Sequence, residues 1–294
     1  MNTIKFKFER RETQRKWVNR LMLSLTIVAS IVVITPLLWI LAYVTQQGLP
    51  AIRSLTFFTA LPTPVGVPGG GIGNALVGSL MTVGLGLVIA APIGTLAGFY
   101  AAAQPNSPFG LLIRFGTDVI SGVPSIVMGI FAYTLIVLPQ RHFSAFSGGV
   151  VLSFIMLPII VRTTEEMLKL VPNTLNEASL ALGAAEWKTA FSVILPAAFN
   201  GVLTGLMLAI ARAAGEAAPM LFTSFGNPFM NTDYSQPVAT LPHTIYVYAI
   251  SPYNDWHTKA WGTALVLILL VLLLNLAARL TVWWRVRQLG TVDR

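Results

Sequence analysis

The sequence has 294 residues, a formal net charge of +8 and no cysteine; 55% of its residues are hydrophobic and only 10% are charged. A mean hydropathy of +0.72 excludes an ordinary soluble domain, in which about 25% of residues are charged. We therefore expect one polytopic membrane domain, and the absence of cysteine excludes disulfides, thiolate metal sites and cysteine nucleophiles.

Basic residues gather at the two ends of the chain. Residues 1–20 contain seven Lys or Arg and two Glu, residues 279–294 contain four Arg and one Asp, and the segment between them has no net charge. Basic residues flank membrane spans on the cytoplasmic side, so we expect both termini in the cytoplasm and an even number of spans. The same distribution explains the positive charge without nucleic-acid binding.

Six segments are apolar over the roughly 20 residues that a helix needs to cross a bilayer. The sequence thus predicts an all-α protein with a basic tail over 1–20, a membrane domain over 21–283 and a second tail over 284–294. The six expected transmembrane helices are Leu21–Val44, Gly73–Tyr100, Val119–Leu138, Gly149–Leu168, Pro196–Phe222 and Ala260–Trp283. The first follows basic residues as a secretory signal does, but it is too long and has no cleavage site, so we expect it to be retained.

The loops between the spans are expected to alternate between the two sides of the membrane. From a cytoplasmic start, 101–118 and 169–195 lie in the cytoplasm, and 223–259 lies outside. Within that last outer loop, Thr240–Ser251 is expected to form a short helix, a candidate docking surface for an external partner. The first outer loop is rich in Pro and Gly over 61–74, but no Lys-Ser/Thr follows its glycines, and the chain nowhere contains the Gly-x-x-x-x-Gly-Lys-Ser/Thr pattern of a phosphate loop. Any ATP used must therefore be bound by another subunit.

Glycine and proline within the spans predict a tightly packed bundle that can bend. Gly94 and Gly98 form a Gly-x-x-x-Gly pair, which lets a neighbouring helix approach closely. Several prolines lie within spans or at their ends, where each frees a backbone carbonyl and bends its helix. These prolines are Pro92, Pro124, Pro158, Pro196 and Pro219. One kinked span would be ordinary, but this number favours a bundle that changes shape.

Charged residues within the spans are the candidates for a substrate path. Arg212 and Glu216 lie four residues apart in the fifth span, so we expect them on one helix face, and Arg162 lies in the fourth span with Glu165 and Glu166 just beyond. An ionised residue at mid-bilayer costs roughly 2.5–3.5 kcal/mol, so it normally faces a bundle interior or a water-filled path. Arginine suits a tetrahedral oxyanion because its planar fork donates two parallel hydrogen bonds and keeps its charge. Two interpretations stay open: Arg212 and Glu216 only neutralise each other, or Arg212 belongs to an anion path.

The cytoplasmic loop over 172–196 has a local pattern of its own. Thr174-x-x-Glu177 is a capping box that would begin a short helix. Small residues such as Ala178 follow, and Gly183 allows a turn or a close approach. The residues alone fit equally well with an amphipathic connector on the membrane surface and with a compact helix that inserts into a groove on a partner.

Two motifs carry a resemblance to known transporters. Residues 177–196, EASLALGAAEWKTAFSVILP, resemble the EAA loop of bacterial ABC-importer permeases, with Ser179 and Val193 as mild departures. That resemblance implies that Glu177, Ala178 and Gly183 couple the chain to a cytoplasmic ATPase.

The second motif, ARAAGEAAPMLFTSF over 211–225, resembles the Ala-Arg-Ala-x-Gly-Glu-Thr-Ala-Pro-Leu-Leu-Phe-Thr segment of Pst-type phosphate permeases. Here Ala217 and Met220 replace a Thr and a Leu, so any substrate contact by that Thr hydroxyl is missing. Chain length and PSIVMGIFAY at 124–133 resemble the PstA-like member of the two permease subunits.

This resemblance implies a type I ABC importer (MetI-like) fold and a permease subunit of a phosphate importer in the bacterial inner membrane. It implies a second permease, two ATP-binding subunits and an external phosphate-binding protein as partners, with Arg212, Glu216 and Arg162 on the path of inorganic phosphate. The subunit itself is expected to be no enzyme, with no catalytic residue, cofactor or metal site.

Other functions would need different features. A permease for sulfate or molybdate would share the cytoplasmic loop and would also need a cation. An ion-coupled secondary carrier would need no ATPase and would be built from inverted repeats, and the sequence has no clear internal repeat. A non-transporting scaffold for phosphate signalling would tolerate loss of the charges within its spans.

Overall fold

The computed structural model of this protein describes residues 2–67 and 69–290. The described chain is helical, which confirms the all-α prediction, and its only β-type pairing is an isolated bridge between Phe225 and Val238. In chain order the helices are α1 Asn2–Ile52, α2 Thr56–Thr59, α3 Gly73–Ala103, α4 Pro108–Gly122, α5 Ser125–Ala132, the π-helix η1 Tyr133–Val137, α6 Leu138–Gln140, α7 Ala145–Lys169, α8 Asn173–Ala181, α9 Glu186–Thr189, the π-helix η2 Ala190–Ile194, α10 Leu195–Ala214, α11 Met220–Thr223, α12 Leu241–Ala249 and α13 Asn254–Gly290.

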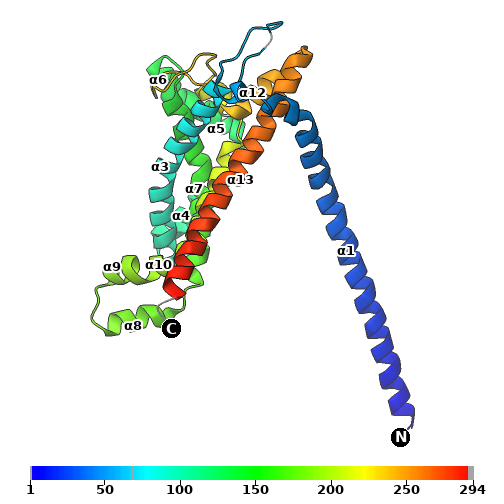
Figure 1. The fold of residues 1–294 in the computed structure, drawn as a ribbon. Helices are drawn as coiled ribbons and strands as arrows, with labels where there is room; N and C mark the ends of the chain where they lie inside the picture. Colours follow the sequence, from blue (N-terminus) through cyan, green and yellow to red (C-terminus); the bar gives the residue numbers. More distant parts are fainter. Residues whose placement is uncertain (1, 68, 291–294) are drawn as a thin grey trace. The chain divides into compact units, whose positions relative to one another are not determined.

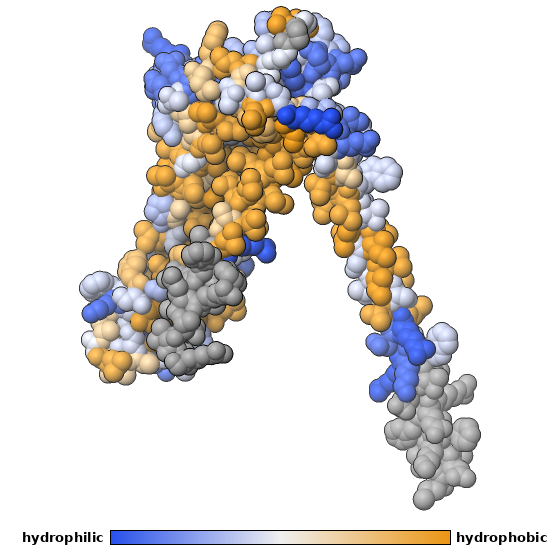
Figure 2. Space-filling model, viewed as in Figure 1, coloured by the Kyte–Doolittle hydropathy of each residue, from blue (hydrophilic) through white to orange (hydrophobic). Residues whose placement is uncertain are grey.

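The chain forms two compact units, Met1–Gln47 and Gly48–Arg294. The first unit is one helix, the greater part of α1, and Arg15–Ile52 is long and apolar enough to cross a membrane. The second unit contains the remaining helices and every candidate site residue. On its surface, apolar side chains form a band over the middle, with hydrophilic side chains gathered at the end where α6 and α12 lie (Figure 2). This distribution is typical of a bundle whose middle lies in hydrocarbon.

Packing of α3 against α7 forms the centre of the second unit, and α10 packs on α7 (Figure 1). A Cβ added at Gly94 would lie 2.8 Å from Ile160 Cγ2, and one at Gly98 would lie 2.5 Å from the Val161 carbonyl oxygen. The predicted close approach at this glycine pair is therefore confirmed. Because glycine lacks a side chain, the two helix backbones come into direct contact there.

Gly98→Val is expected to reduce the amount of folded, assembled protein several-fold. Overpacking a close helix contact costs roughly 1–3 kcal/mol, and a Val side chain has no room beside Val161 and Thr164. Gly84→Val is the matched control on the same helix, since no atom lies within 4 Å of a Cβ placed there. The yield of monodisperse protein after detergent extraction distinguishes the two variants. Equal yields would contradict the packing argument.

The third expected span, Val119–Leu138, is wrong as a single helix. The chain breaks between α4 and α5, and the two parts are bent by 103°. Val123 and Pro124 are extended at the break, because proline disfavours helical conformation in the residue before it and donates no hydrogen bond. α4 also begins at Pro108, within a segment expected to be a cytoplasmic loop.

The bent pair joins opposite ends of the bundle. The pair begins beside the last residues of α3, which pack against Val161 in the second half of α7. It ends just before Ala145, the first residue of α7, and therefore at the other end of that helix. Five described helices are long and apolar enough to cross a membrane, and the bent pair is a sixth such segment when its two parts count as one. The expected number of spans is thereby confirmed, with one span broken.

The fifth expected span, Pro196–Phe222, is also too long. α10 ends at Ala214, and α11 is a separate turn. At the same end of the bundle, α12 corresponds to the short helix expected over Thr240–Ser251. α8 and α9 lie together at the other end (Figure 1), which we call the α8–α9 end.

Candidate functional site

Arg212 lies in the last turn of α10 and contacts Glu216 across the end of that helix. Ala214 is the last helical residue, Gly215 caps it, and Glu216 follows in the non-helical segment before α11. The prediction of one helix face is wrong, because Gly215 is a poor helix former and Pro219 cannot donate the bond that would continue the helix. The pairing itself is confirmed, since Arg212 Nη2 lies 2.8 Å from Glu216 Oε1.

The two members of this pair differ sharply in exposure. The Arg212 side chain is 62% exposed, whereas that of Glu216 is 8% exposed. Glu216 Oε1 is buried without a hydrogen bond of good geometry, so its contact with Arg212 is one of charge rather than of an aligned bond. The buried carboxylate thus depends on Arg212 for compensation, while the guanidinium still has N–H groups to offer outside the chain.

The segment that carries the buried carboxylate is anchored to α5 and α7. Thr223 accepts hydrogen bonds at its carbonyl from Ser147 Oγ, 2.9 Å away, and from the Ser144 N–H, 3.1 Å away. The Thr223 hydroxyl donates to the Pro219 carbonyl at 2.8 Å, and a Cβ at Gly129 would lie 2.7 Å from Pro219 Cα. Most of the motif after the Arg–Glu pair is therefore structural, since it holds the pair in place.

Arg162 lies on α7, and its Nη2 contacts Oδ1 of Asp118 on α4. The side chains are 53% and 60% exposed respectively. Asp118 was absent from the predicted site, because the sequence placed residues 101–118 in a cytoplasmic loop. Its position four residues after Arg114 was the available signal, since that spacing places the two on one face of a helix.

Glu165 belongs to a separate cluster at the α8–α9 end. Its Oε1 accepts from Arg114 Nε at 2.7 Å and from Lys169 Nζ at 2.6 Å. Arg114 also donates from Nη1 to the Pro105 carbonyl at 2.7 Å and from Nη2 to the Ala101 carbonyl at 2.6 Å. This arginine is thus bonded on all three nitrogens and joins the ends of α3, α4 and α7.

The 172–196 loop contains the expected short helix but not the expected cap. α8 begins directly after Pro172, which caps it without a side-chain bond, so Thr174 lies inside the helix and the capping box is wrong. At the other end Gly183 has φ +80° and closes a Schellman turn. In that turn the N–H of Gly183 donates to the Leu180 carbonyl and that of Ala184 to the Ser179 carbonyl.

The residues predicted to couple to an ATPase lie on the surface of this loop. Glu177, Ala178 and Gly183 are exposed, and no atom lies within 4 Å of a Cβ placed at Gly183. Ser179, a departure from the motif, shares a 2.8 Å hydrogen bond with Thr189 on α9, so it helps to fix α8 against α9. The turn expected at Gly183 is confirmed, whereas the coupling role remains a prediction.

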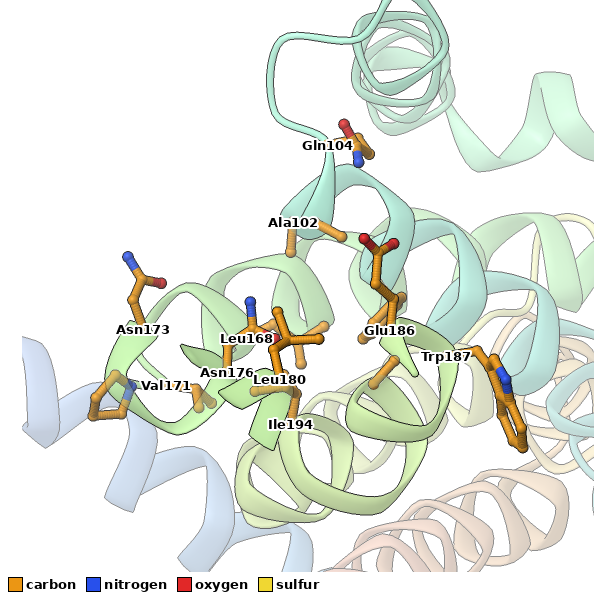
Figure 3. A pocket seen from close by; sticks show the side chains of 14 residues that line it. Ala102, Gln104, Leu168, Val171, Asn173, Asn176, Leu180, Glu186, Trp187 and Ile194 are labelled. Carbon is orange, nitrogen blue, oxygen red and sulfur yellow. The ribbon is translucent and has the colours of Figure 1, made fainter. Parts of the chain in front are cut away.

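A cavity of about 570 Å³ lies between the loop and the ends of α3 and α7. Figure 3 shows side chains of α8, α9 and the α3 end around it, among them Asn176, Leu180, Glu186 and Gln104. The cavity leaves the loop in partial contact with the bundle. Because this space is not filled by side chains, the loop can move against the bundle with less loss of packing contacts than a movement of α3 against α7 would require.

A second cavity, of about 620 Å³, lies at the opposite end, between segment 61–64, segment 225–229 and α12. Burial lowers the pKa of its His243 imidazole. Burial, and secondarily the charge of Asp255, raises the pKa of its Tyr248 hydroxyl. Both groups are therefore neutral near pH 7, and the side chains that line this cavity provide no cation for an anion. The anion-binding candidates remain Arg212 and Arg162.

Comparisons with known proteins match nearly the whole chain. The family model described as "binding-protein-dependent transport system inner membrane component" matches residues 94–283. The phosphate transport system permease protein PstA of Haemophilus influenzae is 44% identical over 90% of this chain and 94% of that protein. PstA of Yersinia pestis is 41% identical over 92% of each, and PstA 1 of Mycobacterium tuberculosis (strain H37Rv) is 35% identical over 90% of this chain and 87% of that protein.

Among solved structures, the chain is similar to one from an inward-facing MetNI methionine ABC transporter. The TM-score is 0.58 at 21% identity, and the match covers 72% of this chain and 93% of the other. This likeness establishes the shared fold alone.

Proposed function

We propose, since the chain belongs to the family of binding-protein-dependent inner membrane transport components and within it to the PstA-type phosphate permeases, that it is a permease subunit of an ATP-driven phosphate importer. Its fold, a type I importer permease of six crossings, is the one that the sequence predicted. The observation that carries the proposal is the Arg212–Glu216 pair. A membrane-spanning helix ends in an arginine that is 62% exposed while its counter-charge is buried.

Phosphate recognition by Arg212 follows from this asymmetry. The exposed guanidinium can donate two parallel hydrogen bonds to an oxyanion without first leaving the protein interior. Glu216 balances the charge when the path is empty, which weakens binding enough for phosphate to leave again. Arg162 provides a further cation on the same subunit, closer to the α8–α9 end.

The partners in this proposal are a second, related permease, two ATP-binding subunits and an external phosphate-binding protein. The exposed surface of α8, with Glu177, Ala178 and Gly183, would contact an ATP-binding subunit in the cytoplasm. The protein is then a multi-pass component of the bacterial inner membrane with both termini in the cytoplasm, and it binds no nucleotide of its own. ATP-driven closure of the ATPases would move α8 and switch the bundle between inward- and outward-open states.

Phosphate uptake by proteoliposomes tests the proposal. Vesicles that hold this chain, the second permease and the ATP-binding subunits, supplied with the external binding protein, are expected to accumulate phosphate only when ATP is enclosed. An equal concentration of sulfate is expected to leave the rate unchanged. Uptake by the purified chain alone under a proton or sodium gradient would instead support a secondary carrier. Inhibition by sulfate would support a different oxyanion as substrate.

A further inference from the structure

Asp118 and Arg162 form an ion pair in which each side chain is more than half exposed, although both residues belong to helices of the bundle. Arg162 precedes the end of α7 at Lys169 by seven residues, a distance of about 10 Å along the helix. Ionised side chains at such a depth are costly against lipid. The Arg162 side chain reaches across to Asp118 on α4 instead of extending along α7 toward the membrane surface at the end of that helix. The face that bears this pair therefore borders water or another subunit.

The neighbouring ion pair on the same two helices contains an arginine with a structural role, which can be compared with Arg162 by the hydrogen bonds that its guanidinium donates. Arg114 and Glu165 lie one turn closer to the α8–α9 end, and all three Arg114 nitrogens donate hydrogen bonds within the chain. Within residues 2–67 and 69–290, Arg162 contacts a carboxylate through Nη2 alone. The guanidinium of Arg162 thus keeps most of its donors free, as that of Arg212 does.

Arg162 and Arg212 lie at two different depths. A Cβ at Gly205 on α10 would collide with the side chain of Thr163, so Gly205 and Arg162 lie at nearly the same level. Arg212 follows Gly205 by seven residues on α10, which places it about 10 Å further from the α8–α9 end. The subunit therefore presents two partly bonded arginines in succession, each with a single carboxylate partner.

We propose that Asp118 competes with phosphate for Arg162 and so controls the release of phosphate toward the α8–α9 end. This inference rests on the proposed function, because it assigns the release step of the same path. When the path is empty, Asp118 occupies one side of the Arg162 guanidinium. When phosphate reaches Arg162, the anion displaces the carboxylate, and the carboxylate later displaces the anion.

The competition follows from the chemistry of the two anions. Phosphate carries a charge of −1 to −2 near neutral pH and has more acceptor oxygens than a carboxylate, so it can take the guanidinium from Asp118. Asp118 is tethered beside Arg162, and its effective concentration there is high and constant. Transport depends on the release of phosphate as well as on its entry, so a transport site must not hold phosphate too tightly. A tethered competitor such as Asp118 limits the affinity in this way.

Asp118→Asn tests the inference in the assembled complex reconstituted in proteoliposomes. With the competitor gone, phosphate binds more tightly and leaves more slowly, so KM for phosphate and the maximal uptake rate are each expected to fall about fivefold. Asp118→Glu keeps a carboxylate and is expected to stay within about twofold of the unmodified complex in both quantities. Glu165→Gln is the matched control, since it makes the same chemical change beside the fully bonded Arg114; its KM is expected to stay unchanged.

An unchanged or higher KM for an assembled Asp118→Asn complex would overturn the inference. If that variant does not assemble, the double variant Asp118→Asn, Arg162→Gln leaves no unpaired charge and tests whether Arg162 binds phosphate, as the inference requires. The KM of this double variant for phosphate is expected to rise about tenfold, and a KM equal to that of the unmodified complex would overturn the inference. Failure of the unmodified complex to take up phosphate would instead overturn the proposed function.

Discussion

Replacing both Arg212 and Glu216 by glutamine is expected to leave a complex that assembles but takes up phosphate about 100-fold more slowly, because two charge-assisted hydrogen bonds to the substrate are lost. The double variant is more informative than Arg212→Gln alone. Glu216 is 8% exposed, and a buried carboxylate without its cation costs about 3–5 kcal/mol, enough to prevent assembly on its own. The measurement is the rate of phosphate uptake per assembled complex.

Arg212→Lys separates charge from geometry at the same site. An ammonium keeps the pairing with Glu216 but lacks the planar fork, so uptake is expected to fall about tenfold while assembly stays normal. Near-normal uptake by the double glutamine variant would make the pair structural, as an ion pair replaced by neutral groups can be tolerated. The anion path would then have to run through Arg162.

Gly183→Trp is expected to reduce the ATP-binding subunit that co-purifies with this chain at least about tenfold, without preventing membrane insertion. No atom of the chain lies within 4 Å of a Cβ at this position, so the added indole projects outward into any partner seated on α8. A poorly matched bulky group at the centre of an interface typically costs more than 1.4 kcal/mol, the equivalent of a tenfold change in affinity. Quantitative co-purification checks the result.

Two control variants separate the protruding side chain from strain in the turn. Gly183→Asn keeps a residue that tolerates positive φ, so it is expected to retain the ATP-binding subunit. Gly66→Trp makes the same change in a loop at the opposite end, where φ is +78° and the surroundings are equally open. It is expected to leave co-purification unchanged. If Gly183→Trp also left co-purification and uptake unchanged, the coupling role of α8 would be wrong.

The strongly patterned parts of the fold could be predicted from the sequence. Long apolar segments identify membrane spans because the hydrocarbon core admits no unpaired backbone groups. The Gly94–Gly98 pair predicted a close approach by another helix, which the structure identifies as α7, and Gly183 was expected to allow a turn or a close approach, of which the turn after α8 is observed. These are features that a few neighbouring residues determine.

The remaining features depend on contacts between distant segments. Pro124 was recognised as a bend, but a bend of 103° that divides the span depends on what α4 and α5 pack against. The end of α10 at Ala214 was missed because apolar residues continue beyond it as α11. The Asp118–Arg162 contact joins residues 44 positions apart, and hydropathy alone had assigned Asp118 to a loop.

The Arg114 cluster has a mechanical consequence. One guanidinium joins backbone carbonyls at the end of α3 to Glu165 on α7, a few residues before the chain enters α8. Three helices are thereby joined into a rigid block at the end where the loop begins. A push on α8 is then shared by the block instead of tilting α7 alone. The bending that alternating access requires must then occur farther from the α8–α9 end. There Pro92 and Pro158 interrupt the backbone hydrogen bonds of α3 and α7, and the chain breaks between α4 and α5.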